Sequence, residues 1–149
     1  MEAIVMEKRD GLTKSIATLG TIFMWFPLIA TLVFSGLHLA RSGGQSFNID
    51  YLMPAELFPA ALIGGILLLW ACVRAHSHKK TIIWGFVILL IAFFLGLMIL
   101  PVVTGLASGE TAAVGLPWMF TMGSLVIYIL AMIELGIAGI SLIRTLFKH

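Results

Sequence analysis

Charged residues are scarce in this sequence. Only 11% of the 149 residues are charged, whereas 60% are hydrophobic. An average soluble domain carries about 25% charged residues. A water-soluble fold of this size could not cover its surface with so few charges, so lipid must be the solvent for most of that surface. We expect a single domain over residues 1–149, because the chain has no room for a second sizeable one.

Cysteines and blocks of like charge are scarce as well. The single cysteine, Cys72, excludes an internal disulfide and paired-thiol redox chemistry. The net charge of +2 comes with no basic arm, so we expect no nucleic-acid partner. The sequence also lacks the Gly-x-Ser-x-Gly, Gly-Lys-Ser/Thr and His-Glu-x-x-His motifs of hydrolases, nucleotide-binding proteins and zinc proteases. We therefore expect no enzymatic activity from this chain alone.

Four long apolar runs predict four transmembrane helices. The first, residues 15–40, is too long for the core of a cleavable signal peptide, so we predict a retained helix. The other three cover residues 55–73, 81–107 and 117–144, and the last of them begins at Pro117, a residue suited to the first turn of a helix. The predicted fold class is an all-α integral membrane protein, an antiparallel four-transmembrane-helix bundle.

The basic residues predict the orientation of the bundle. Eight of them fall in segments that an even number of crossings places on one side: Lys8, Arg9, Lys14, Arg74, Lys79, Lys80, Arg144 and Lys148. The other side carries only Arg41, beside Asp50, Glu56 and Glu110. By the positive-inside rule, the first side is cytoplasmic. We therefore predict a multi-pass protein of the plasma (inner) membrane with both termini in the cytoplasm.

Glu134 is the most informative residue for function. It lies ten residues before Arg144, or about 15 Å along a helix, near the middle of a hydrocarbon layer about 30 Å thick. A carboxylate at that depth must be protonated, paired or next to water. It also belongs to a stripe of mostly small or polar residues that we expect to face other helices: Ser124, Ile127, Ala131, Glu134, Ala138 and Ser141.

Counting inward from each cytoplasmic anchor gives the residues at the same depth. They include Trp25, the nearby Pro27, and the pair Gly64 and Gly65. We expect Glu134 to accept a hydrogen bond from the Trp25 indole or to line a small polar cavity beside Pro27. Glu134 would then be either a ligand- or proton-binding carboxylate or a protonated group that joins helices. Small residues such as Gly64 permit close helix packing, and we expect a similar packing face at Gly105-xxx-Gly109.

The histidines give little support for a metal or haem site. His38 would lie near the outer end of the first helix, where it could pair with Glu56. His76, His78 and His149 would lie on the opposite side, so a haem held by two histidines of one copy is not expected. His76 and His78 alone do not make a zinc site. We predict no metal and no cofactor within the chain, although a haem or quinone shared with a partner stays open.

These observations leave three functional hypotheses. The first is a non-catalytic subunit or assembly partner of a larger membrane complex, because the soluble loops are short and small-residue faces are abundant. The second is a small oligomeric transporter or channel in which Glu134 binds the solute or a proton. The third is a quinone- or haem-associated redox subunit. All three place the chain in a lipid bilayer as a homo-oligomer or in a hetero-complex with other membrane subunits.

Overall fold

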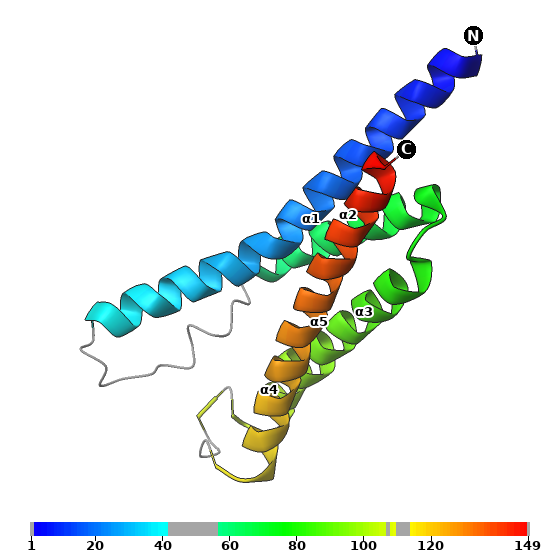
Figure 1. The fold of residues 1–149 in the computed structure, drawn as a ribbon. Coiled ribbons are helices and arrows are strands. Elements are labelled where there is room, and N and C mark those ends of the chain that lie inside the picture. The colour runs from blue at the N-terminus through cyan, green and yellow to red at the C-terminus, as the bar shows by residue number, and fades with distance from the viewer. Residues whose placement is uncertain (1, 42–56, 107, 110–113, 149) are drawn as a thin grey trace.

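All regular structure in the described part of the chain is helical. The computed structural model describes residues 2–41, 57–106, 108–109 and 114–148. The elements, in chain order, are α1 (Glu2–Arg41), α2 (Phe58–Ala75), α3 (Lys79–Ile91), the π-helical segment η3 (Ala92–Ile99), α4 (Leu100–Val103) and α5 (Leu116–Phe147) (Figure 1). α3, η3 and α4 follow one another without interruption, so they form a single long helical rod.

Four of these helical stretches are long and apolar enough to cross a membrane. They are Gly11–His38, Phe58–Ala75, Lys79–Val103 and Leu116–Phe147. At a rise of about 1.5 Å per residue, even the 18 residues of the second reach nearly 30 Å. The prediction of an all-helical chain with four helices able to span a membrane is therefore confirmed for the described residues, and these helices suggest a multi-pass membrane protein.

Prolines mark where two of the helices begin. A proline occupies the first turn of α2 and of α5, where its missing N–H removes no intrahelical bond. Pro27 instead lies inside α1 and is buried there, and its carbonyl accepts a hydrogen bond of 2.8 Å from the hydroxyl of Thr31. α1 thus continues past a residue that usually disrupts a helix, because its neighbours enclose that residue.

The helices pack around α5 and α1. α1 packs against α2 along one side and against α5 along another, while α3 and η3 pack against α5. The beginning of α1 and the end of α5 lie at the same end of the molecule (Figure 1). At that end, the Lys14 ammonium lies 5.1 Å from the centre of the Phe147 ring, which joins the two helices by a cation–π contact.

Glycines allow the closest approaches between these helices. A β-carbon added at Gly64 would lie 3.0 Å from the backbone oxygen of Gly20 and from the backbone nitrogen of Met24, so α1 and α2 touch backbone to backbone. A β-carbon at Gly65 would overlap the Phe86 ring of α3. Such contacts supply packing energy where lipid gives no hydrophobic driving force.

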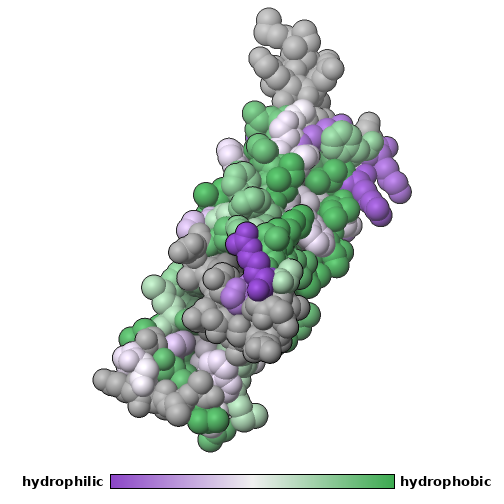
Figure 2. Space-filling model, turned by 90° about the vertical axis from the view of Figure 1, so that its left-hand side faces the viewer, coloured by the Kyte–Doolittle hydropathy of each residue, from purple (hydrophilic) through white to green (hydrophobic). Residues whose placement is uncertain are grey.

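The surface of the bundle is apolar over most of its length. Large hydrophobic side chains such as Leu32 and Val102 are about 70% exposed (73% and 67%), which suits lipid rather than water. Figure 2 shows one face, with hydrophobic atoms over its middle and hydrophilic atoms gathered toward the upper end and in one patch beside the grey atoms.

The rod formed by α3, η3 and α4 ends earlier than the sequence predicts. The helix ends at Val103, and Gly105 and Gly109 have φ angles of 72° and 74° in the turns that follow. These left-handed conformations suit glycine and no helix. The prediction that Gly105-xxx-Gly109 forms a helical packing face is therefore wrong.

Candidate functional site

Glu134 lies on the outer surface of the helices, beside the line where α5 meets α3. Its side chain is exposed, whereas the next two residues, Leu135 and Gly136, are buried. A β-carbon added at Gly85 of α3 would lie 3.9 Å from the Glu134 carboxyl carbon and 3.1 Å from the Leu135 side chain. The absence of a side chain at Gly85 thus lets α3 pack against Leu135 and leaves the carboxylate at the edge of the contact.

A surface groove of about 420 Å³ runs along this edge. Six of its lining residues come from α5: Leu130, Ile133, Glu134, Ile137, Ala138 and Ser141. His78 and Thr81 line it from the beginning of α3. We call this feature the Glu134 groove, because it combines that carboxylate with two hydroxyls and an imidazole on otherwise aliphatic walls.

The turn between α2 and α3 positions the histidine of the groove. His76 and His78 have φ angles of 54° and 55°, in the left-handed region that few non-glycine residues adopt. The carbonyl of His78 accepts a hydrogen bond of 3.2 Å from the backbone N–H of Ile82, which starts the following helix. The His78 Nε2 and the Ser141 Oγ lie 3.4 Å apart, within hydrogen-bond distance, so the turn is joined to α5.

The groove reaches from the end of the bundle toward its middle. Ser141 lies near the C-terminal end of α5, and Glu134 lies seven residues earlier, about 10 Å deeper along the helix axis. No ion pair involves Glu134 among the residues that the structure describes. If α5 crosses a bilayer, a carboxylate so placed faces hydrocarbon unless another molecule covers it.

The predicted neighbour Trp25 lies on a different side of α5. Its indole packs against Gly136, where an added β-carbon would lie 2.8 Å from Nε1. This buried nitrogen has no hydrogen-bond partner within the described ranges. The expected hydrogen bond from Trp25 to Glu134 is therefore absent, and the two residues belong to two different helix contacts.

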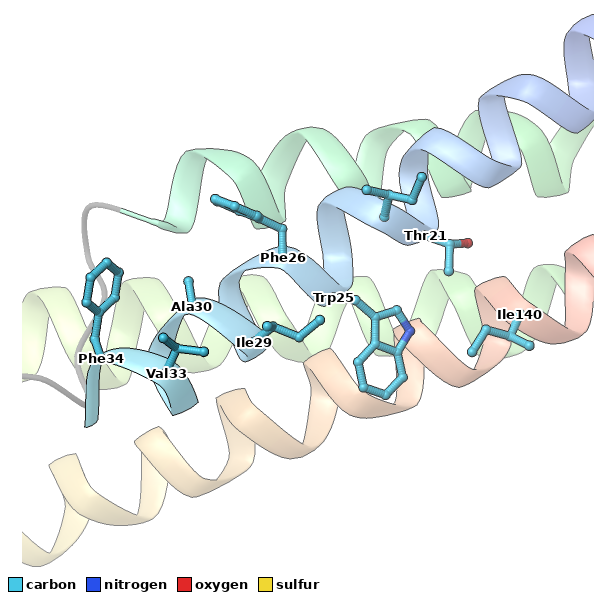
Figure 3. A pocket seen from close by; sticks show the side chains of 9 residues that line it. Thr21, Trp25, Phe26, Ile29, Ala30, Val33, Phe34 and Ile140 are labelled. Carbon is cyan, nitrogen blue, oxygen red and sulfur yellow. The ribbon is translucent and has the colours of Figure 1, made fainter. Parts of the chain in front are cut away.

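A second groove, of about 570 Å³, surrounds Trp25 between α1 and α5 (Figure 3). Its other lining residues are Thr21, Ile22, Phe26, Ile29, Ala30, Val33, Phe34 and Ile140. The Thr21 hydroxyl donates a hydrogen bond of 2.8 Å to the backbone oxygen of Ala17, so the only hydroxyl of this lining is already engaged. This groove is apolar and is lined by neither Pro27 nor Glu134, and the Glu134 groove does not include Pro27, so the predicted polar cavity that joins Glu134 and Pro27 is not formed.

The predicted helix-facing stripe on α5 is correct only in part. Ala131 and Ala138 are buried, and Ser124 fills the space that a β-carbon at Gly96 would need. Ile127 and Glu134, however, are exposed. The stripe therefore runs along the boundary between the packed and the outer face of α5.

Three of the remaining candidate residues, Gly64, Gly65 and His38, lie apart from the Glu134 groove. Gly64 and Gly65 form the helix contacts described above, and their surroundings there are packing contacts with α1 and α3. His38 is half-buried near the end of α1. Glu56, its expected partner, lies outside the described residues. The structure thus brings none of Gly64, Gly65 and His38 next to Glu134.

An aromatic cluster was missed by the sequence analysis. The rings of Phe58 and Phe93 stack with their centres 3.4 Å apart, and Phe94 and Tyr128 pack around them. The Tyr128 hydroxyl is buried without a hydrogen-bond partner in the described part of the chain. The run Phe93-Phe94 was a signal for this cluster, but only the π-helical backbone of η3 sets how the two rings are directed.

The described residues contain no group of three histidine, cysteine, aspartate or glutamate side chains that could hold a metal ion. His78 and Glu134 line the same groove, but Ser141 and Thr81 are the other polar groups there. Carboxylate, imidazole and hydroxyls on aliphatic walls suit hydrogen bonding or charge pairing with an amphipathic or membrane-embedded group.

Comparisons with known proteins give no relative for this chain. No family model matches it, and neither a curated protein nor a solved structure matches it. Its function must therefore be inferred from the geometry of its own residues.

Proposed function

We propose that this chain is a non-catalytic membrane subunit that joins a larger complex through the Glu134 groove. The observation that carries the proposal is the exposure of Glu134 on the outer surface of the helices. A charged side chain at the centre of a bilayer costs about 2.5–3.5 kcal/mol on insertion scales. A neighbouring protein that covers the groove and supplies a complementary polar or charged group would offset that cost.

The proposal includes a topology. We propose an antiparallel four-helix bundle in the plasma membrane with both termini in the cytoplasm. Its support is the eight-to-one distribution of basic residues and the common end at which α1 begins and α5 ends. In this orientation the His78 and Ser141 end of the groove lies at the cytoplasmic interface and Glu134 lies deeper.

The test is purification of the tagged full chain from its native membranes in a mild detergent, followed by native gel electrophoresis and mass determination. We expect an assembly that contains a second, different chain in fixed stoichiometry, and we expect Glu134→Leu to release it. Val126→Leu is a matched control, because Val126 is exposed on α5 but does not line the groove. A homo-oligomer unaffected by Glu134→Leu would contradict the proposal.

A small oligomeric transporter is a second candidate function. The observation that favours it is the continuity of the groove from the His78–Ser141 contact to Glu134. A homo-oligomer reconstituted into vesicles would then show a solute flux that depends on pH and is abolished by Glu134→Gln. Absence of any such flux, together with a fixed second chain, would leave the subunit proposal.

A further inference from the structure

The residues that line the Glu134 groove are arranged as in a groove that a second helix packs into. Its α5 positions follow the spacing three, one, three, one, three: Leu130, Ile133, Glu134, Ile137, Ala138 and Ser141. This spacing is the one that a helix presents to another helix laid along it. The positions run over twelve residues, 130–141, or about 16 Å of α5, which matches an elongated occupant better than a compact one.

The charge of the groove selects the chemistry of that helix. Glu134 is an acidic group with no ion pair to any described residue. In hydrocarbon the complementary group is a basic side chain, since charged residues inside membranes pair with one another or with polar groups. Nearer the cytoplasmic end, Thr81 and Ser141 offer hydroxyls to polar side chains of the same helix.

A second copy of this chain cannot supply the basic group. Lysine and arginine are absent between Lys14 and Arg41, between Arg41 and Arg74, between Lys80 and Arg144, and thus from the interior of every span. Two copies facing each other through this groove would bring carboxylate to carboxylate at the same depth. A second copy therefore leaves the ionised carboxylate without a basic partner, which favours a helix from a different protein.

We infer that the Glu134 groove binds a transmembrane helix of another protein that places a lysine or arginine against Glu134 near the middle of the membrane. The inference rests on the proposed function and names the chemistry of its partner. The basic side chain ends at the carboxylate, and the helix lies along Leu130, Ile137 and Ala138 toward Ser141.

The experiment uses the full chain in phosphatidylcholine vesicles and synthetic transmembrane peptides of about 20 residues in a leucine–alanine background. One peptide carries arginine at its centre, a second carries leucine there, and a third carries the arginine one helical turn away. Energy transfer between labelled peptide and labelled protein measures association. We expect the central-arginine peptide to associate about tenfold more tightly than the leucine peptide, and the displaced arginine to lose most of that gain.

Variants of the protein test which of its groups binds the arginine of the peptide. Glu134→Gln should abolish the preference for the central arginine, and Ser141→Leu, which narrows the groove, should weaken association of all three peptides. Equal association of the arginine and leucine peptides with the unmodified chain overturns the inference, and this comparison needs no variant to fold. A preference that survives Glu134→Gln also overturns it.

Two further outcomes separate other occupants. Energy transfer between two copies that depends on Glu134 would show a second copy in the groove and overturn the inference. Binding of tetraphenylphosphonium that is lost in Glu134→Gln, with no preference among the peptides, would assign the groove to small organic cations. If the native assembly depends on Glu134 while the peptides show no preference, the proposed function stands and the basic partner helix is wrong.

Discussion

The two grooves that flank α5 differ in the polar groups that line them. The groove at α1 contains Trp25, and its walls are aliphatic and aromatic. The groove at α3 contains a carboxylate, two hydroxyls and an imidazole. Lipid chains can cover the first groove, because its exposed surface is apolar. They cannot pair with the polar groups of the second groove. In a membrane protein, an exposed surface therefore indicates a binding site only where it carries polar or charged groups that lipid chains cannot pair with.

The largest expected losses of stability, at Gly136 and at Trp25, lie on the α1 side of α5. Gly136→Leu should destabilise the bundle by about 2–3 kcal/mol, because any β-carbon there meets the Trp25 ring. Thermal unfolding in detergent micelles measures it. Gly123→Leu is the matched control on the same helix, since a β-carbon at Gly123 meets nothing within 4 Å. Equal losses in both variants would show that the Trp25 contact does not determine the packing.

Two substitutions of Trp25 should separate the contribution of its ring volume to stability from that of its indole N–H. We expect Trp25→Ala to cost about 3 kcal/mol through lost packing. Trp25→Phe should cost clearly less, because the indole nitrogen donates to no described group. The midpoint of unfolding of the two variants in the same micelles checks this order. A loss in Trp25→Phe as large as in Trp25→Ala would point to a hydrogen bond of the indole.

On the α3 side of α5, we expect a substitution to raise the unfolding free energy instead of lowering it. Glu134→Leu should raise the stability of the isolated chain by about 1–2 kcal/mol, because it removes a polar group from a lipid-facing surface. The unfolding free energy of the purified chain, with Val126→Leu as the neutral reference, provides the measurement. Destabilisation would mean that Glu134 makes a contact within its own chain.

The smallest effect concerns the contact between the α2–α3 turn and α5. Ser141→Ala should change the unfolding free energy by less than about 0.5 kcal/mol, since the 3.4 Å contact with His78 is exposed. The same unfolding measurement applies. A loss above about 1 kcal/mol would show that this contact holds the turn in place.

Hydropathy and the spacing of charges predict the helices, because the length and polarity of a membrane span are properties of the local sequence. They also give an expected depth for Glu134, which stays a prediction. They fail for its neighbours, because equal depth says nothing about the direction around a helix. Glu134 and Gly136 are two residues apart and so point about 200° apart, and it is Gly136 that meets Trp25. Only the packed bundle shows which side of α5 each neighbouring helix takes.

The C-terminal part of the helical rod formed by α3, η3 and α4 is the least predictable part of the fold. The same composition suits an α-helix and a π-helix, and the end at Val103 depends on glycine conformations in the turns beyond. The Gly105-xxx-Gly109 spacing was therefore read as a packing face, although it belongs to those turns.

The π-helical segment η3 has a consequence for how the chain tolerates changes in length. A π-helix accommodates more residues per turn than an α-helix, so Ala92–Ile99 stores extra chain within a continuous rod. After deletion of one residue there, the segment can return to α-helical geometry. The helical parts before and after it then keep the same sides turned toward their neighbours. The same deletion in the α-helical part at Lys79–Ile91 would rotate everything before it by about 100° relative to α5. A scan of single-residue deletions should therefore find its tolerant sites within η3, in the middle of a span where none would be expected.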